Sequence, residues 1–145
     1  MGMFGAIDAA ASGLTAERLR MDVISNNIAN ANTTRTVEGG PYRRQMVMFQ
    51  PRNASQSSFS QIFSQQMEAG SGVRVVGIVK DDSPTKKVYD PSHPDADTQG
   101  YIELPNINIV SEMVDMITAT RAYEANVTAV NAAKSMALKA LEIGK

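Results

Sequence analysis

Apolar side chains recur at a seven-residue spacing in the first thirty residues of the chain. The repeating positions are Ile7, Leu14, Met21 and Ile28, with Ile24 in the companion row. These are the a and d positions of a coiled-coil seam, so the pattern predicts an amphipathic helix from about residue 3 to about residue 30. The run NNIANANTT follows. Because asparagine hydrogen-bonds local backbone and tolerates left-handed conformations, this run predicts the end of the helix.

A second heptad pattern fills the last third of the chain, from about residue 108 to about residue 143. Its members include Met113, Met116, Tyr123, Val127, Val130 and Leu141. Pro105 precedes the pattern and Gly144 follows it, and Asn108 or Ser111 is expected to cap its start. The predicted helix is about 50 Å long at 1.5 Å per residue. That length exceeds what a small domain needs for its own core.

The middle of the chain, from about residue 34 to residue 105, contains all the prolines and has a different pattern. Alternating or β-branched segments predict strands at 42–49, 73–80, 86–89 and 101–104. A Ser- and Gln-rich stretch at about 53–72 separates the first two strands and is expected to be a loop or a short helix. The predicted fold class is α+β: residues 1–33 and 106–145 form long terminal helices of a coiled-coil assembly domain, and residues 34–105 form a small β-rich module.

Composition removes several functional classes. The 145 residues carry 14 Lys and Arg against 15 Asp and Glu, for a net charge of -1, which argues against nucleic-acid binding through a basic face. The count of Cys is 0 and that of His is 1, so thiolate chemistry and multi-histidine metal sites are excluded. No apolar stretch is long enough to span a bilayer, and the N-terminus does not resemble a cleaved signal peptide, so we expect no membrane insertion.

One polar cluster, DPSHPDADTQGY, has residues suited to binding a hard divalent cation, namely Asp90, His93, Asp95 and Asp97. The alternative is a set of turns, because Pro91 and Pro94 fix the backbone and Asp side chains bond nearby amides. The turn interpretation is favoured. Since glycine-rich phosphate loops and nucleophile elbows are also absent from the sequence, we expect a protein that is not an enzyme and has no cofactor or metal.

Two terminal helices with continuous seams predict assembly. They are expected to pair within one chain, and the apolar positions left over then need neighbouring chains. A heterologous contact that does not close repeats into a helical tube. A soluble coiled-coil adaptor with a single partner is the alternative, and it predicts a stable helical monomer or dimer.

The segments SNNIANANTT, PYRRQMVMF and EMVDMITATRAYEANVTAVNAAKSMALKALEIGK resemble the bacterial flagellar rod and hook axial proteins. The segment VYDPSHPDADTQGYIELPNINIVSEMVDMI resembles the proximal rod members of that family. The resemblance implies a structural subunit whose terminal helices surround a central export channel, in a rod that crosses the periplasm and transmits torque. It also implies export by the flagellar type III apparatus without signal cleavage. Implied partners are copies of the chain, other rod proteins, and neighbouring basal-body and hook-side axial proteins.

The resemblance extends to particular positions. Asn26, Asn27, Ile28 and Asn30 match the asparagine motif, which is interpreted as a polar network between subunits, the alternative being a fraying helix end. Arg121, Tyr123, Glu124 and Asn126 match the C-terminal motif. These residues and the seam positions form the predicted assembly interface. The predicted rod-type segment, expected to touch neighbouring rod subunits, consists of Asp90, Pro91, His93, Pro94, Asp95, Asp97, Gly100 and Tyr101.

Overall fold

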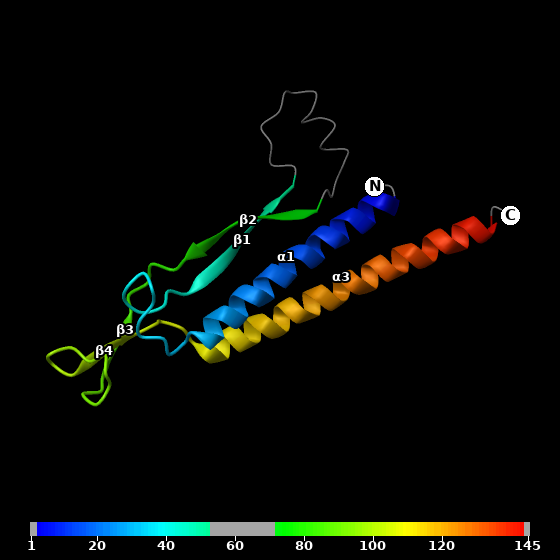
Figure 1. Cartoon of the computed structure of the whole chain (residues 1–145). Coiled ribbons are helices and arrows are strands. Elements are labelled where there is room, and N and C mark those ends of the chain that lie inside the picture. Colours follow the sequence, from blue (N-terminus) through cyan, green and yellow to red (C-terminus); the bar gives the residue numbers. More distant parts are fainter. Residues whose placement is uncertain (1–2, 53–71, 144–145) are drawn as a thin grey trace, which may run out of the picture.

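The computed structural model describes residues 3–52 and 72–143 as two long helices and two short β-hairpins (Figure 1). The elements are α1 (Met3–Ala29), β1 (Gln45–Pro51), β2 (Val73–Lys80), β3 (Lys86–Tyr89), β4 (Tyr101–Leu104) and α3 (Ile109–Ile143). The helices run antiparallel, and the β3–β4 hairpin lies near the end where α1 finishes and α3 begins (Figure 1). The predicted α+β class with long terminal helices is confirmed.

The predicted strands agree closely with the structure. The bounds of β2, β3 and β4 match the prediction, whereas β1 begins three residues later than the expected start at residue 42. The stretch predicted to be a loop or short helix at 53–72 falls almost entirely outside the described residues. None of the described helices is both long and apolar enough to cross a membrane.

Asparagine side chains fix both helix ends near the β3–β4 hairpin. The Asn108 Oδ1 atom accepts hydrogen bonds from the amides of Val110 (3.0 Å) and Ser111 (3.4 Å), so Asn108 is the cap of α3. At the end of α1, Asn30 Nδ2 donates to the Asn26 carbonyl at 2.9 Å. The asparagine run therefore ends the helix by satisfying backbone groups locally, as its composition predicts.

Helix α1 is the central element, because both α3 and the β1–β2 hairpin pack along it. Strands β1 and β2 are antiparallel, with a register shift between Met48 and Phe49. The β3–β4 pair forms a separate two-stranded sheet. Small and aliphatic side chains make up the buried core; from the two helices these are Ala10, Ala16, Val23, Ile24, Ala119 and Ala133.

Two glycine positions show how closely the elements approach. A Cβ atom on Gly13 of α1 would lie 2.9 Å from Asn126 Nδ2 of α3. Gly72 precedes β2 with φ +87°, and a Cβ atom there would lie 3.1 Å from the Cα of Ala9. Ser12 joins the same contact, since its hydroxyl accepts a hydrogen bond from the Val73 amide at 3.0 Å. Side chains larger than hydrogen at either glycine would separate the packed elements.

The predicted single seam of α3 divides into two rows in the structure. Met116, Tyr123 and Val130 are half-buried on the side of α1. Met113, Val127 and Leu141 are more exposed, with exposed fractions of 55%, 36% and 70%. The tightest contact is made by Ala119 and Ala133, because small side chains let the helix axes approach. These three seam positions are exposed in the single chain, and their place in an interface between copies stays a prediction.

Candidate functional site

A buried asparagine joins α1 to the β1–β2 hairpin and to α3. Asn27 is 1% exposed, and its Nδ2 atom donates to the Gln45 carbonyl at 2.9 Å and to Glu112 Oε2 at 3.0 Å. Its Oδ1 atom accepts from the Gln45 amide at 2.9 Å and from the Tyr42 hydroxyl at 3.1 Å. Both donors and both acceptor positions of the amide are thus occupied within one chain.

The carboxylate of Glu112 is the other buried polar group of this junction. It is 1% exposed and accepts from Arg44 Nε at 2.6 Å through Oε1. A buried carboxylate is tolerated where it is paired and hydrogen-bonded, and Arg44 and Asn27 together supply both conditions. Burial, followed by the Glu112 charge, raises the pKa of the Tyr42 hydroxyl. That hydroxyl therefore stays protonated and keeps donating to Asn27.

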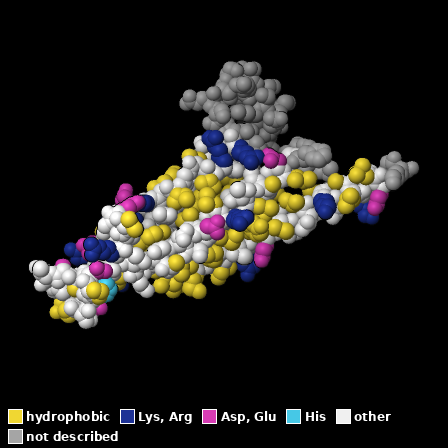
Figure 2. All heavy atoms as spheres, in the orientation of Figure 1, with side chains coloured by type: hydrophobic (Ala, Val, Ile, Leu, Met, Phe, Trp, Pro, Cys, Tyr) yellow, Lys and Arg dark blue, Asp and Glu magenta, His cyan; other side chains and the backbone are white. Residues whose placement is uncertain are grey.

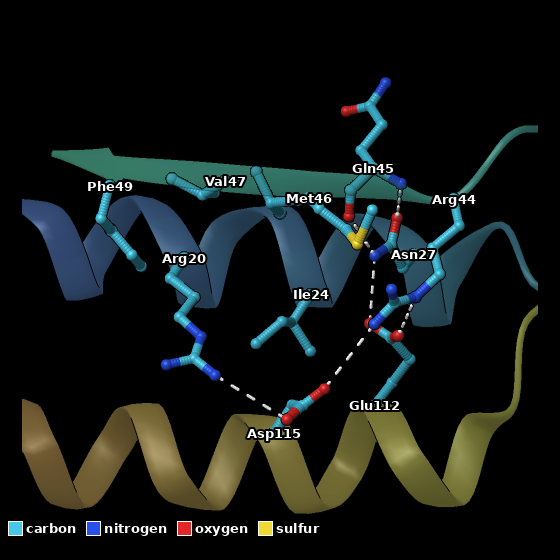
Figure 3. Close-up of a pocket in the computed structure, with 11 residues that line it drawn as sticks. Arg20, Ile24, Asn27, Arg44, Gln45, Met46, Val47, Phe49, Glu112 and Asp115 are labelled. Atoms are coloured by element: carbon cyan, nitrogen blue, oxygen red, sulfur yellow. Dashed lines mark hydrogen bonds and ion pairs between the residues drawn. The ribbon is translucent and has the colours of Figure 1, made fainter. Parts of the chain in front are cut away.

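Weaker ion pairs extend the junction along the two helices. Asp115 Oδ2 of α3 lies 3.7 Å from Arg44 Nη2, and Asp115 Oδ1 lies 3.8 Å from Arg20 Nη2. Beside these charges is a hollow of about 350 Å³ between β1, α1 and α3, here called the groove. Ile24, Met46 and Phe49 project into it, and Arg20 and Asp115 lie at its rim (Figure 3).

The geometry of Asn27 differs from the interpretation of the asparagine motif as a polar network between subunits. Asn27 has its full set of hydrogen bonds inside the chain, so it has none left for a neighbouring copy. The other members of the motif stay candidates for the interface: Asn26 is exposed, and Ile28 and Asn30 are half-buried. The sequence could not show these bonds, because Glu112 is 85 residues away and only the antiparallel pairing of the helices brings it to Asn27.

The C-terminal motif contributes to packing within the chain as well as to the surface. Asn126 is half-buried against Gly13, and its Nδ2 atom donates to the Ala122 carbonyl at 2.9 Å. Tyr123 is half-buried, whereas Arg121 and Glu124 are exposed. On the N-terminal seam, Ile7, Leu14 and Met21 are half-buried and Ile24 is buried.

The rod-type segment forms the connection between β3 and β4. Asp97 Oδ1 accepts from the amides of Gln99 (2.8 Å) and Tyr101 (2.9 Å), and Asp90 Oδ1 accepts from the Ser92 amide at 3.1 Å. These hydrogen bonds hold the pKa of both carboxyl groups below their usual range; for Asp97 the Tyr101 amide is the largest cause, and for Asp90 the Ser92 hydroxyl. Asp side chains that bond local amides are typical of turns.

Other parts of the segment support this turn structure. His93 Nδ1 accepts from the Asp95 amide at 3.1 Å, and Asp95 Oδ2 accepts from the Thr34 hydroxyl at 2.8 Å, which ties the segment to the chain after α1. The rings of Tyr89 and Tyr101 meet edge to face with centroids 5.2 Å apart. Gly100 has φ +81°, and a Cβ atom there would lie 2.9 Å from the Tyr89 ring. Pro91 and Pro94 are exposed. Across residues 3–52 and 72–143, no three His, Cys, Asp or Glu side chains converge on a point that suits a metal ion.

Sequence reasoning did not identify Glu112 or Arg44 as parts of a site. Glu112 lies in the first turn of a helix, where acidic residues commonly interact with the helix dipole at the surface. Arg44 is one of two adjacent arginines, and only Arg44 reaches the buried carboxylate. The sequence offered no signal that separates these two from ordinary surface charges.

Comparison with known proteins adds a family to this geometry. The family profile described as "Flagella basal body rod protein" matches residues 7–35, and that described as "Flagellar basal body rod FlgEFG protein C-terminal" matches residues 98–143. The flagellar basal-body rod protein FlgC of Borreliella burgdorferi is 54% identical over 99% of this chain and 98% of that protein. The proteins of the same name from Bacillus subtilis and Salmonella typhimurium are 50% and 36% identical, each over the full length of both chains.

Proposed function

This chain belongs to the FlgC family of flagellar basal-body rod proteins. We propose that it polymerises into the proximal rod through the exposed apolar side chains of α3, which are named in the next paragraph. The chain is a structural subunit of the basal-body rod, and the family is not enzymatic. The proposal goes further in two respects: it names the surface used for assembly, and it assigns the assembled helices to a tube that transmits torque and encloses the export channel.

The observation that carries the proposal is the amount of apolar surface that α3 leaves uncovered. Residues with exposed fractions between 36% and 70% are Ile109, Val110, Met113, Val114, Ile117, Val127, Met136, Leu138 and Leu141. Figure 2 shows hydrophobic side chains over much of the helical surface. Contiguous apolar surface on a soluble chain marks an interface with another chain.

The acidic residues near the start of α3 support this assignment. Glu112 and Asp115 pair with Arg44 and Arg20, on the side of α3 that faces the rest of the chain. Val110, Met113, Val114 and Ile117 follow the i, i+3, i+4, i+7 spacing of one helix face. The two carboxylates thus lie on a different face of α3 from these four apolar side chains. A neighbouring helix can cover the apolar face without burying the carboxylates.

Family membership implies that the partners are other rod proteins, since rod proteins assemble with one another. We assign the contacts to copies of this chain, to other rod proteins and to adjoining basal-body and hook-side axial proteins, after export by the flagellar type III apparatus. The rival assignment to a soluble coiled-coil adaptor loses its basis, because the family match covers the full chain.

Val127→Asp tests the proposal, and Val130→Asp is the matched variant. Val127 is exposed in the single chain, so we expect Val127→Asp to leave the monomer's melting temperature within a few degrees of wild type while rods and swimming are lost. Val130 is half-buried toward α1, so Val130→Asp should lower the melting temperature itself. The measurements are thermal unfolding of purified monomer, and electron microscopy of basal bodies from complemented cells. Normal rods with Val127→Asp would overturn the proposed surface.

A further inference from the structure

Methionine thioethers are the most readily oxidised groups of this chain, because the sequence contains no cysteine. Among the described residues, Met113 of α3 and Met48 of β1 are each 55% exposed. Met21 and Met116 are half-buried, and the Met21 Sδ atom accepts a hydrogen bond from the Thr120 hydroxyl at 3.6 Å. An oxidant dissolved in water therefore reaches Met113 and Met48 more easily than these two half-buried thioethers.

The side chains around Met113 on α3 are all apolar. On a helix, the residues three and four positions away are the nearest neighbours of a side chain. For Met113 these are Ile109, Val110, Met116 and Ile117, and none of them can donate a hydrogen bond. Ile109, Val110 and Ile117 are 42%, 70% and 55% exposed. These four neighbours thus offer no donor to an oxygen atom placed on the Met113 sulfur.

We propose that Met113 is an oxidation site that controls assembly: reaction of its thioether with a peroxide in the free subunit prevents entry into the rod. The sulfur attacks one oxygen of hydrogen peroxide, an S–O bond forms and the O–O bond breaks. The proton of the transferred hydroxyl passes to the leaving hydroxide, which departs as water. Sulfur gives up an electron pair and becomes a sulfoxide, and the peroxide is reduced.

The block follows from the chemistry of the sulfoxide at this position. In the free subunit, water donates hydrogen bonds to the sulfoxide oxygen. A neighbouring chain that covers the apolar face removes this water, and the side chains beside Met113 supply no donor in its place. Burial of an unpaired polar group is unfavourable, and the contact recurs at every copy in the rod. Reductases that act on methionine sulfoxide restore the thioether, so the block is reversible.

This inference rests on the proposed rod function and adds regulation to the same surface. Its first test is the reaction of the purified subunit with hydrogen peroxide, followed by mass spectrometry of its peptides. We expect Met113 and Met48 to be oxidised several-fold faster than Met21 and Met116. Oxidation of Met21 as fast as that of Met113 would overturn the selectivity on which the inference depends.

Two substitutions separate polarity from the loss of methionine. Met113→Gln places a polar group where the sulfoxide would lie, whereas Met113→Leu keeps an apolar side chain that peroxide does not oxidise. In complemented cells, we expect Met113→Gln to abolish rods and Met113→Leu to retain them, with the melting temperature of both monomers close to wild type. Met48→Gln is the matched control, because Met48 is equally exposed but lies outside α3, and it should retain rods. Normal rods with Met113→Gln, or equal loss with Met48→Gln, would overturn the inference.

The sulfoxide itself is followed in cells that build rods in the presence of hydrogen peroxide below the lethal dose. Mass spectrometry compares rods with subunits that were exported but not assembled. We expect Met48 sulfoxide in both pools and Met113 sulfoxide almost entirely in the unassembled pool. Equal Met113 sulfoxide in the two pools would overturn the block and leave the rod function in place, because loss of rods with Val127→Asp tests that function separately.

Discussion

At the scale of single residues, Asn27 shows how one side chain can set the position of three elements. Its amide group bonds both backbone groups of Gln45 as a neighbouring strand would, and it also reaches Glu112. A buried polar group of this kind adds little net stability when its hydrogen bonds are made, but removing it leaves its buried partners without a hydrogen bond. Substitutions at Asn27 should therefore affect the monomer before they affect the rod.

We expect Asn27→Ala to lower the free energy of unfolding of the monomer by about 2–4 kcal/mol, because the Gln45 backbone groups and the Glu112 carboxylate each lose a partner. Asn27→Asp should be worse at pH 7, since it places a second carboxylate beside Glu112. Because burial and the like charge raise the pKa of the new carboxyl group, its penalty should grow as the pH rises from about 4 to 7. Urea unfolding across this pH range measures both effects.

Asn26→Ala is the matched control, because Asn26 is adjacent and exposed. Its effect on the free energy of unfolding should stay within about 0.5 kcal/mol. Equal stability of Asn27→Ala and wild type, with loss of rods, would contradict the intramolecular role and restore the interpretation of Asn27 as a contact between subunits.

The carboxyl group of Asp97 gives the rod-type segment a defined response to acid. Its pKa is held below the ordinary value of 3.8 by the amides of Tyr101 and Gln99. A lowered pKa means that its contribution is complete above pH 3.8 and is lost as the pH falls through the folded-state pKa. We expect the protection of the Gln99 and Tyr101 amides against hydrogen exchange, measured relative to the intrinsic exchange rate, to fall over that acid range. Asp97→Asn should remove the pH dependence; an unchanged profile in that variant would show that another group titrates.

At the scale of elements, the sequence predicted the existence of both helices and the bounds of three strands. Heptad spacing, Asn108 and the asparagine run were sufficient for the helices, because these signals act locally. The orientation of α3 could not be predicted, since rows containing Met113 and Met116 are equally apolar. Ala119 and Ala133 decide which row faces α1, through a close approach that depends on the partner helix.

Gly13 offers a test of that close approach. Alanine is favoured over glycine in a helix by about 1 kcal/mol. In the wild-type chain, however, the new Cβ atom would press on Asn126, whose amide is held by the Ala122 carbonyl. We expect Gly13→Ala to lower the melting temperature in the wild-type background and to raise it in an Asn126→Ala background. Calorimetry on the four proteins measures this coupling.

Gly77 is the control for this comparison, because a Cβ atom there would meet nothing within 4 Å. Gly77→Ala should shift the melting temperature equally in both backgrounds. If Gly13→Ala does the same, then Asn126 does not limit the distance between the helices.

At the scale of the whole molecule, the strand pattern and the prolines suggested that residues 34–105 form a module of their own. In the structure the β1–β2 hairpin lies along α1, and the β3–β4 hairpin is a separate sheet. The buried junction could not be predicted from the sequence, because Asn27, Arg44 and Glu112 come from three distant segments. Local signals identified the elements, but the contacts between distant segments had to come from the fold.

We predict that residues 34–105, produced alone, do not fold cooperatively. Among the described residues of this range, Ile102 and Pro105 are the buried ones, and the other core positions lie mainly on the helices. The hairpin also loses the Asn27 bonds to Gln45 and the Ser12 bond to Val73, and an isolated two-stranded hairpin is marginal in water. Circular dichroism should show a gradual melt for the fragment and a sigmoidal one for the full chain. A sigmoidal melt of the fragment would mean that the hairpins hold a core without α1, and the central role of that helix would then be wrong.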